Sequence, residues 1–140
     1  MYIIYRIINR ITDFPRNTKF FFQRIFRGYG DDDLWSLGSW ILNKTRKPFK
    51  AFVKNQKEHG HKSYPVGLLS EKRIDIRKDD GYDRWINILE QIEEAIDLNW
   101  QEDNATDEWF AKTTEEHIKD NEKIAKGLEL FGKYIRNFWD

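Results

Sequence analysis

The sequence predicts an all-α protein: a single compact domain of about five helices over residues 1–140, with a long C-terminal helix. Apolar residues recur three and four positions apart along most of the chain, which is the spacing of amphipathic helices. The length of 140 residues suits one domain. Aromatic residues form 16% of the chain, so a few side chains supply the area that a core must bury.

The first predicted helix covers residues 2–11, where isoleucines stand at positions 3, 4, 7, 8 and 11. Pro15 is predicted to interrupt it, because proline disfavours helical geometry at the preceding residue. Residues 1–16 therefore form an N-terminal amphipathic helix that can lie at the periphery of the domain. A second, basic helix is expected over residues 17–27, and its three consecutive phenylalanines cannot all share one face.

A corner rich in charge follows this helix. Gly28 and Gly30 are expected to end it, and three aspartates at 31–33 follow directly. A carboxylate at this place can cap the next helix by accepting its free N–H groups. Binding of a divalent cation is the alternative for the three aspartates, and capping is favoured because consecutive side chains diverge. The next apolar pattern covers residues 34–42, and Pro48 is expected to bend or end that helix.

The remaining elements are read from turns and caps. Residues 59–67 form a turn-rich loop, and residues 73–79 suggest a short strand or extended connector. Asp80 can cap a helix over residues 81–99, and a polar break over 101–106 precedes a long final helix over 107–138. Thr113 and Glu116 match a capping box, so this last helix can be split there.

Charge is balanced overall but divided along the chain. Residues 1–70 hold 13 Lys and Arg against 5 Asp and Glu, and residues 71–140 hold 11 against 19. Attraction between the two halves within the fold is the simpler interpretation, and a basic face that binds an anion is the alternative.

The absence of cysteine excludes disulfides and thiolate metal sites. No apolar run approaches the ~18 residues of a membrane span, so we expect an intracellular protein without a membrane partner.

Basic residues interleaved with Phe and Trp predict a surface for phosphate or nucleotide ligands. This surface comprises Arg24, Arg27, Lys44, Arg46, Lys47, Lys50, Lys54 and Lys57. The candidate ligand-binding residues are Arg24, Arg27, Tyr29, His59, His61 and Tyr64. The zero net charge argues against a stable complex with nucleic acid, and no cofactor is expected. The two loop histidines lack an evident third metal ligand, so a structural role without chemistry is their alternative.

Carboxylates on the helix over residues 81–99 suggest a weaker, catalytic alternative. Glu90 and Glu93 stand three residues apart, as in the first half of the magnesium site of all-α nucleotide pyrophosphatases. Glu116 is the candidate third ligand, but the second half of that motif is missing. We therefore favour a solvated acidic face and expect no metal site. His117, on the apolar stripe of the last helix, is expected in the core or at an interface.

Three segments carry a family resemblance. Residues 27–37 (RGYGDDDLWSL) are similar to an Arg-Gly-aromatic-small-Asp-x-Asp-x-Trp signature, residues 59–67 to a Gly-Tyr-Pro-x-Gly loop with Ser63 in place of the glycine, and residues 130–140 to a Leu-Phe…Trp-Asp ending. Residues 85–96 also match a Trp-x-x-Ile-Leu-x-x-Ile pattern. Over about residues 20–140 the chain thus resembles a family of small, largely uncharacterised proteins of tailed bacteriophages. The resemblance implies action in the cytoplasm of an infected bacterium, and it implies no established activity.

Together these observations favour a phage-encoded, non-catalytic binding protein that counters host antiviral defence. It would either sequester a small anionic, nucleotide-type signal, at the interface of a homo-oligomer, or dock on a host immune protein. Two alternatives stay open. One is a metal-dependent all-α nucleotide hydrolase, and the other is a minor virion or morphogenesis protein.

Overall fold

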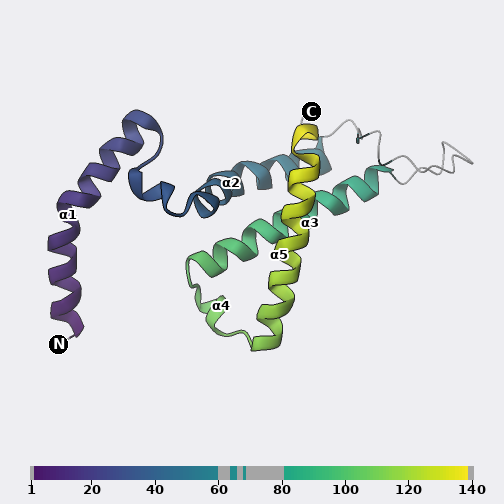
Figure 1. Ribbon diagram of the computed structural model, residues 1–140. Helices are drawn as coiled ribbons and strands as arrows, with labels where there is room; N and C mark the ends of the chain where they lie inside the picture. The colour runs from purple at the N-terminus through teal and green to yellow at the C-terminus, as the bar shows by residue number, and fades with distance from the viewer. Residues whose placement is uncertain (1, 60–63, 66–67, 69–80, 139–140) are drawn as a thin grey trace, which may run out of the picture. The chain divides into compact units, whose positions relative to one another are not determined.

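The structure, a computed structural model, describes residues 2–59, 64–65, 68 and 81–138, with side chains from residue 13 onward. Its helices are α1 (Tyr2–Arg27), α2 (Leu37–Glu58), α3 (Gly81–Asp103), α4 (Asp107–Phe110) and α5 (Thr114–Tyr134) (Figure 1). Two short 3₁₀ turns, η1 (Asp31–Leu34) and η4 (Ile135–Asn137), complete the described elements. Within these ranges there is no strand, so the predicted all-α class with five helices and a long last helix is confirmed.

The chain divides into two compact units, Met1–Trp40 and Ile41–Asp140, and each is described by itself. The first contains α1, η1 and the start of α2, and the second contains the rest. The expectation that residues 1–16 form a peripheral helix stays a prediction. The expectation that residues 1–140 fold as one domain stays a prediction.

The predicted interruption at Pro15 is wrong, because α1 runs through it to Arg27. A proline inside a helix removes one backbone hydrogen bond, at a cost of roughly 3 kcal/mol. The ring of Pro15 is exposed, and Thr18 Oγ1 donates to the Phe14 carbonyl oxygen beside it at 2.7 Å. Pro48 likewise lies inside α2 and does not end it. In both helices the hydrogen bonds of the flanking turns outweigh the single lost bond.

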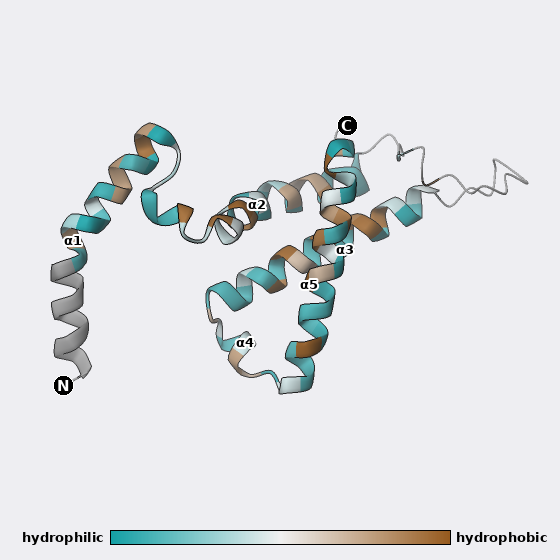
Figure 2. Cartoon of the chain, in the orientation of Figure 1, coloured by the Kyte–Doolittle hydropathy of each residue, from teal (hydrophilic) through white to brown (hydrophobic). Residues whose placement is uncertain are grey.

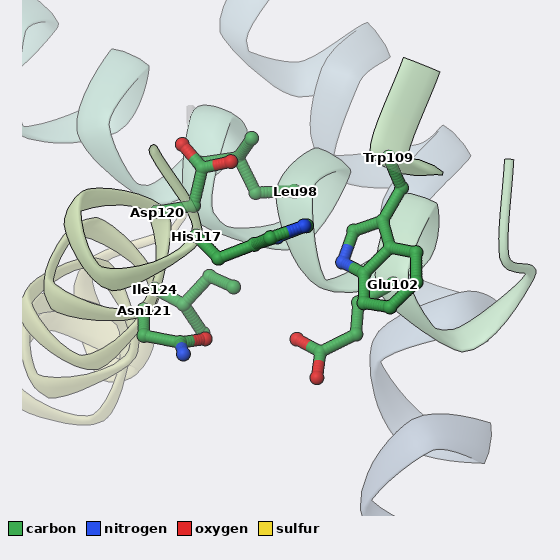
Figure 3. Close-up of a pocket in the computed structure, with 7 residues that line it drawn as sticks. All are labelled: Leu98, Glu102, Trp109, His117, Asp120, Asn121 and Ile124. Carbon is green, nitrogen blue, oxygen red and sulfur yellow. The ribbon is translucent and has the colours of Figure 1, made fainter. Parts of the chain in front are cut away.

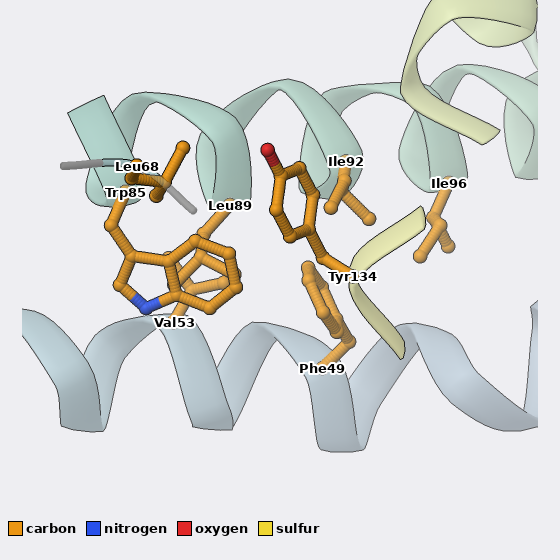
Figure 4. Packing of buried hydrophobic residues seen from close by; sticks show 8 residues of the cluster. All are labelled: Phe49, Val53, Leu68, Trp85, Leu89, Ile92, Ile96 and Tyr134. Carbon is orange, nitrogen blue, oxygen red and sulfur yellow. The ribbon is translucent and has the colours of Figure 1, made fainter. Parts of the chain in front are cut away.

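The core of the second unit lies where α2, α3 and the end of α5 meet (Figure 4). Trp85 and Leu89 project from α3 toward α2, and both are almost fully buried. Tyr134 of α5 packs edge-on against Trp85, with ring centroids 5.5 Å apart. The buried cluster consists of Phe49, Val53, Leu68, Trp85, Leu89, Ile92, Ile96 and Tyr134. Hydrophobic residues recur at helical intervals along these helices, as amphipathic patterning requires (Figure 2).

Helices α3 and α5 pack directly against each other (Figure 1). The approach is close at Gly127, because a Cβ atom there would lie 2.7 Å from the Gln91 carbonyl oxygen and would also overlap the Ala95 methyl group. The two small residues therefore set how near the helices come.

The start of α5 confirms the predicted capping box. Thr113 Oγ1 accepts from the Glu116 backbone N–H at 3.3 Å, and Glu116 Oε2 accepts from the Thr113 N–H at 2.7 Å. The long C-terminal helix is split here as expected, with α4 before the box.

The predicted strand at 73–79 and the cap at Asp80 lie outside the described residues, as does most of the 59–67 loop. Among the helices described, none is long and apolar enough to cross a membrane.

Candidate anion-binding site

The corner between α1 and η1 contains three predicted ligand residues, and its charges are already paired. The Arg24 guanidinium binds Asp32 at 2.7 Å and Asp33 at 2.9 Å. Arg27 binds Asp31 at 2.6 Å and lies over the Tyr29 ring, 4.8 Å from its centroid. An incoming anion would have to displace these carboxylates.

Electrostatics of the corner agree with its geometry. Hydrogen bonds from Arg27, then Gln23 and Lys19, hold the pKa of the Asp31 carboxyl well below its usual range. The pKa of Arg24 is raised, chiefly by its hydrogen bond to Asp33. Asp33 Oδ2 accepts from the Gly30 N–H at 2.7 Å, so this aspartate caps the short 3₁₀ turn η1, whereas the α-helix that the aspartates were predicted to cap begins only at Leu37. Gly28, with φ of 81°, turns the chain out of α1 in the left-handed region that favours glycine.

The other predicted ligand residues lie elsewhere. His59 is exposed at the end of α2, with Nε2 3.8 Å from the Glu58 carboxylate. Tyr64 packs over Gly81, where a Cβ atom would overlap the tyrosine ring. His61 lies outside the described residues. Arg24, Arg27 and Tyr29 therefore belong to the first unit and His59 and Tyr64 to the second, and each group is described within its own unit.

A groove with a stronger case for binding lies along α2 (Leu37–Glu58), entirely within the second unit. Lysines 47, 50, 54 and 57 stand three and four residues apart, so they form one stripe beside the buried stripe of Phe49 and Val53. The groove has a volume of about 420 Å³ and is lined by Lys47, Lys50, Ala51, Val53, Lys54, Lys57 and Glu93. This volume is in the range of small-molecule sites.

Helix α3 presents a row of carboxylates to this lysine groove. Glu90 pairs with Lys57, and Asp97 pairs with Arg46 and, at 3.9 Å, with Lys50. Arg46 also lies over the Trp100 ring, 4.2 Å from its centroid. The expected attraction between the basic and acidic halves of the chain is thus present at this helix pair.

Two lysines of the groove keep charge available for a ligand. The Lys54 side chain is 72% exposed, and its nearest carboxylate, that of Glu58, is 4.0 Å away. Lys50 is 62% exposed and only distantly paired. Burial, ahead of nearby charges, raises the pKa of Glu93, the acid that lines the groove. A raised pKa means that the folded protein disfavours a negative charge at this position.

A second, smaller pocket lies between α3, α4 and α5 (Figure 3). The His117 imidazole points toward the Trp109 indole, with ring centroids 4.7 Å apart, and His117 is half-buried. The pocket has a volume of about 70 Å³, and carboxylates of Glu102 and Asp120 line it. Its Asp120 is already paired with Lys112 at 2.6 Å. The size and the acidic lining suit water molecules better than an anionic ligand.

The residues of the metal-dependent alternative are not gathered in one place. Glu90 pairs with Lys57, and Glu116 is held in the capping box of α5, which lowers its pKa. Across the described part of the chain, no three His, Cys, Asp or Glu side chains are placed to hold a metal ion.

Comparison with known proteins gives no relative: no family model, curated protein or solved structure matches this chain. The resemblance to tailed-phage proteins accordingly stays a prediction.

The sequence analysis included the four groove lysines in a basic surface but did not predict them as ligand residues. Their common spacing on one helix face was the signal that would have selected them.

Proposed function

We propose that this chain is a non-catalytic binding protein that captures a small anionic ligand in the lysine groove of α2. The observation that carries the proposal is the groove itself, which is lined by four lysines together with the apolar side chains of Ala51 and Val53. The ammonium groups of the lining suit phosphate oxygens, and its apolar side chains suit the flat face of a base.

The nucleotide class follows from this combination of charge and apolar area. The corner of Arg24 and Arg27 is the weaker candidate, because its guanidiniums are occupied by Asp31, Asp32 and Asp33. If the chain acts in an infected bacterium, as its resemblance to phage proteins implies, the ligand is a host signalling nucleotide. Its sequestration would counter antiviral defence.

Thermal denaturation of the full chain with and without nucleoside triphosphates, cyclic dinucleotides and inorganic pyrophosphate tests the proposal. A ligand present at 100 times its dissociation constant stabilises the folded state by about 2.7 kcal/mol. Replacing Lys54 by Gln should weaken binding about three- to tenfold, since it removes one charge of the lining without breaking a close ion pair. Lys44→Gln is the matched control, an exposed lysine of the same helix that does not line the groove.

Glu93→Gln separates binding from catalysis. It removes a negative charge from the groove, so the anion should bind more tightly. Because the folded pKa of Glu93 is raised, the protonated side chain favours the folded state. This contribution to stability is full below the unfolded pKa and is lost as pH rises through the folded pKa. Glu93→Gln, which cannot ionise, should therefore also stabilise the protein at neutral pH. In a metal-dependent hydrolase the same change would abolish magnesium-dependent turnover of the nucleotide, and turnover lost in this way would refute the proposal.

A further inference from the structure

Helix α1 (Tyr2–Arg27) is amphipathic along its whole length. Because Pro15 does not break the helix, the isoleucine positions before it and Phe21, Phe22 and Phe26 after it fall on one face. At 100° per residue the apolar positions fall within a sector about 140° wide, over a helix about 39 Å long. These positions are 3, 4, 7, 8, 11, 14, 21, 22, 25 and 26.

The described part of this apolar face is open to solvent. Phe22 is 52% exposed, Ile25 58% and Phe26 83%. Phe20 lies outside the sector, and it is buried at 8% against the Gly30 backbone. Of the three consecutive phenylalanines, the corner therefore buries Phe20 and leaves Phe21 and Phe22 exposed. The sequence analysis predicted that at least one of the three would lie on another face.

The opposite face of α1 is cationic. The helix contains six Lys or Arg residues and a single acid, Asp13, and none of its first eleven residues is acidic. Asp13 pairs with Arg16 at 2.9 Å. The aspartates of the corner pair with Lys19, Arg24 and Arg27. Two further basic residues stand in the N-terminal half of the helix, at positions 6 and 10.

We infer that α1 lies along the surface of an anionic lipid bilayer, with its apolar face at the boundary of the acyl chains. A wide apolar face of Ile and Phe, backed by Lys and Arg, is the pattern of helices that lie in this interface. The sequence-based expectation of no membrane partner rested on the lack of a spanning segment, which a surface helix does not need.

A lipid surface fits α1 better than a second copy of the helix does. Pairing of two α1 helices would cover a narrow seam and leave the rims of a 140° sector exposed. It would also bring together two helices of equal positive charge. A bilayer covers the whole sector, and its anionic headgroups attract the basic residues.

Co-flotation of the full chain with vesicles tests this inference, and it does so independently of the lysine groove. The protein should float with mixed phosphatidylcholine–phosphatidylglycerol vesicles and much less with phosphatidylcholine alone. The double variant Phe22→Ser, Ile25→Ser should reduce partitioning about tenfold or more, because it removes two apolar anchors. Asn17→Ser, on the polar face, is the matched control and should float like the wild type.

Three outcomes would overturn the inference. One is no flotation of a chain whose circular dichroism shows it to be helical, and another is flotation that the double variant leaves unchanged. The third is a different occupant. If α1 joins two copies, the double variant converts a dimer to a monomer in sedimentation without vesicles. If residues 41–140 cover the face, the double variant lowers the melting temperature without vesicles.

Discussion

At the scale of single residues, two glycines of α5 (Thr114–Tyr134) have opposite roles. Gly127 lies where α5 approaches α3, and a methyl group there would overlap Ala95 and the Gln91 backbone. Gly132 is exposed and has no atom within 4 Å of the place where a Cβ would stand. The same residue type is required at one position and is merely tolerated at the other.

We therefore expect opposite effects from the same substitution. Gly127→Ala should lower the free energy of unfolding by about 1–3 kcal/mol, because the packed helices must separate. Gly132→Ala should raise it by roughly 0.5–1 kcal/mol, because alanine has the higher helix propensity. Urea denaturation followed by circular dichroism measures both. Equal effects of the two changes would show that α3 and α5 do not approach closely at Gly127.

At the scale of elements, the corner that joins α1 to η1 is fixed by charge. Its ordered turn depends on Asp31 remaining ionised, and the pKa of Asp31 lies well below the usual range. For an acid with a lowered pKa, the stabilising effect is present above the unfolded pKa of about 3.9 and is lost as pH falls through the folded pKa. The corner should thus persist at mildly acidic pH and loosen only in strong acid.

Carbon NMR of the Asp31 side chain across a pH titration measures this directly. Arg27→Gln should move the pKa of Asp31 upward, toward its usual range, because Arg27 is the largest cause of the shift. Arg16→Gln serves as the control, since Arg16 pairs with Asp13 and should leave Asp31 unchanged. A wild-type Asp31 that titrates near 3.9 would contradict the ion pairs of the corner.

At the scale of the whole molecule, stability is unevenly distributed between the two units. The second unit contains the buried aromatic and aliphatic cluster, whereas among the described side chains of the first only Phe20 is a buried hydrophobic residue. The tight fold of residues 41–140 therefore depends on α3, which supplies Trp85, Leu89, Ile92 and Ile96 to the cluster.

Leu89 is the sharpest probe of this dependence, because none of its surface is exposed. Leu89→Ala should lower the free energy of unfolding by about 2–5 kcal/mol, through the lost apolar burial and the cavity left behind. Ile118→Ala, at a position 55% exposed, should change it by less than about 1 kcal/mol. Denaturant titration followed by tryptophan fluorescence gives both values. A small loss for Leu89→Ala would place the core elsewhere.

The sequence by itself determined the helical class, the first residues of α1, α3 and α4 and the Thr113–Glu116 capping box, because helical spacing and capping depend on residues only a few positions apart. It misjudged Pro15, since an isolated rule about proline omits the hydrogen bonds of the turns on either side. It also proposed Arg24 and Arg27 as ligand residues without knowing that Asp31, Asp32 and Asp33 would fold back onto them. Tertiary structure decided which basic side chains are neutralised and which line a groove, because charge pairing depends on distances in space between side chains that are apart in the chain.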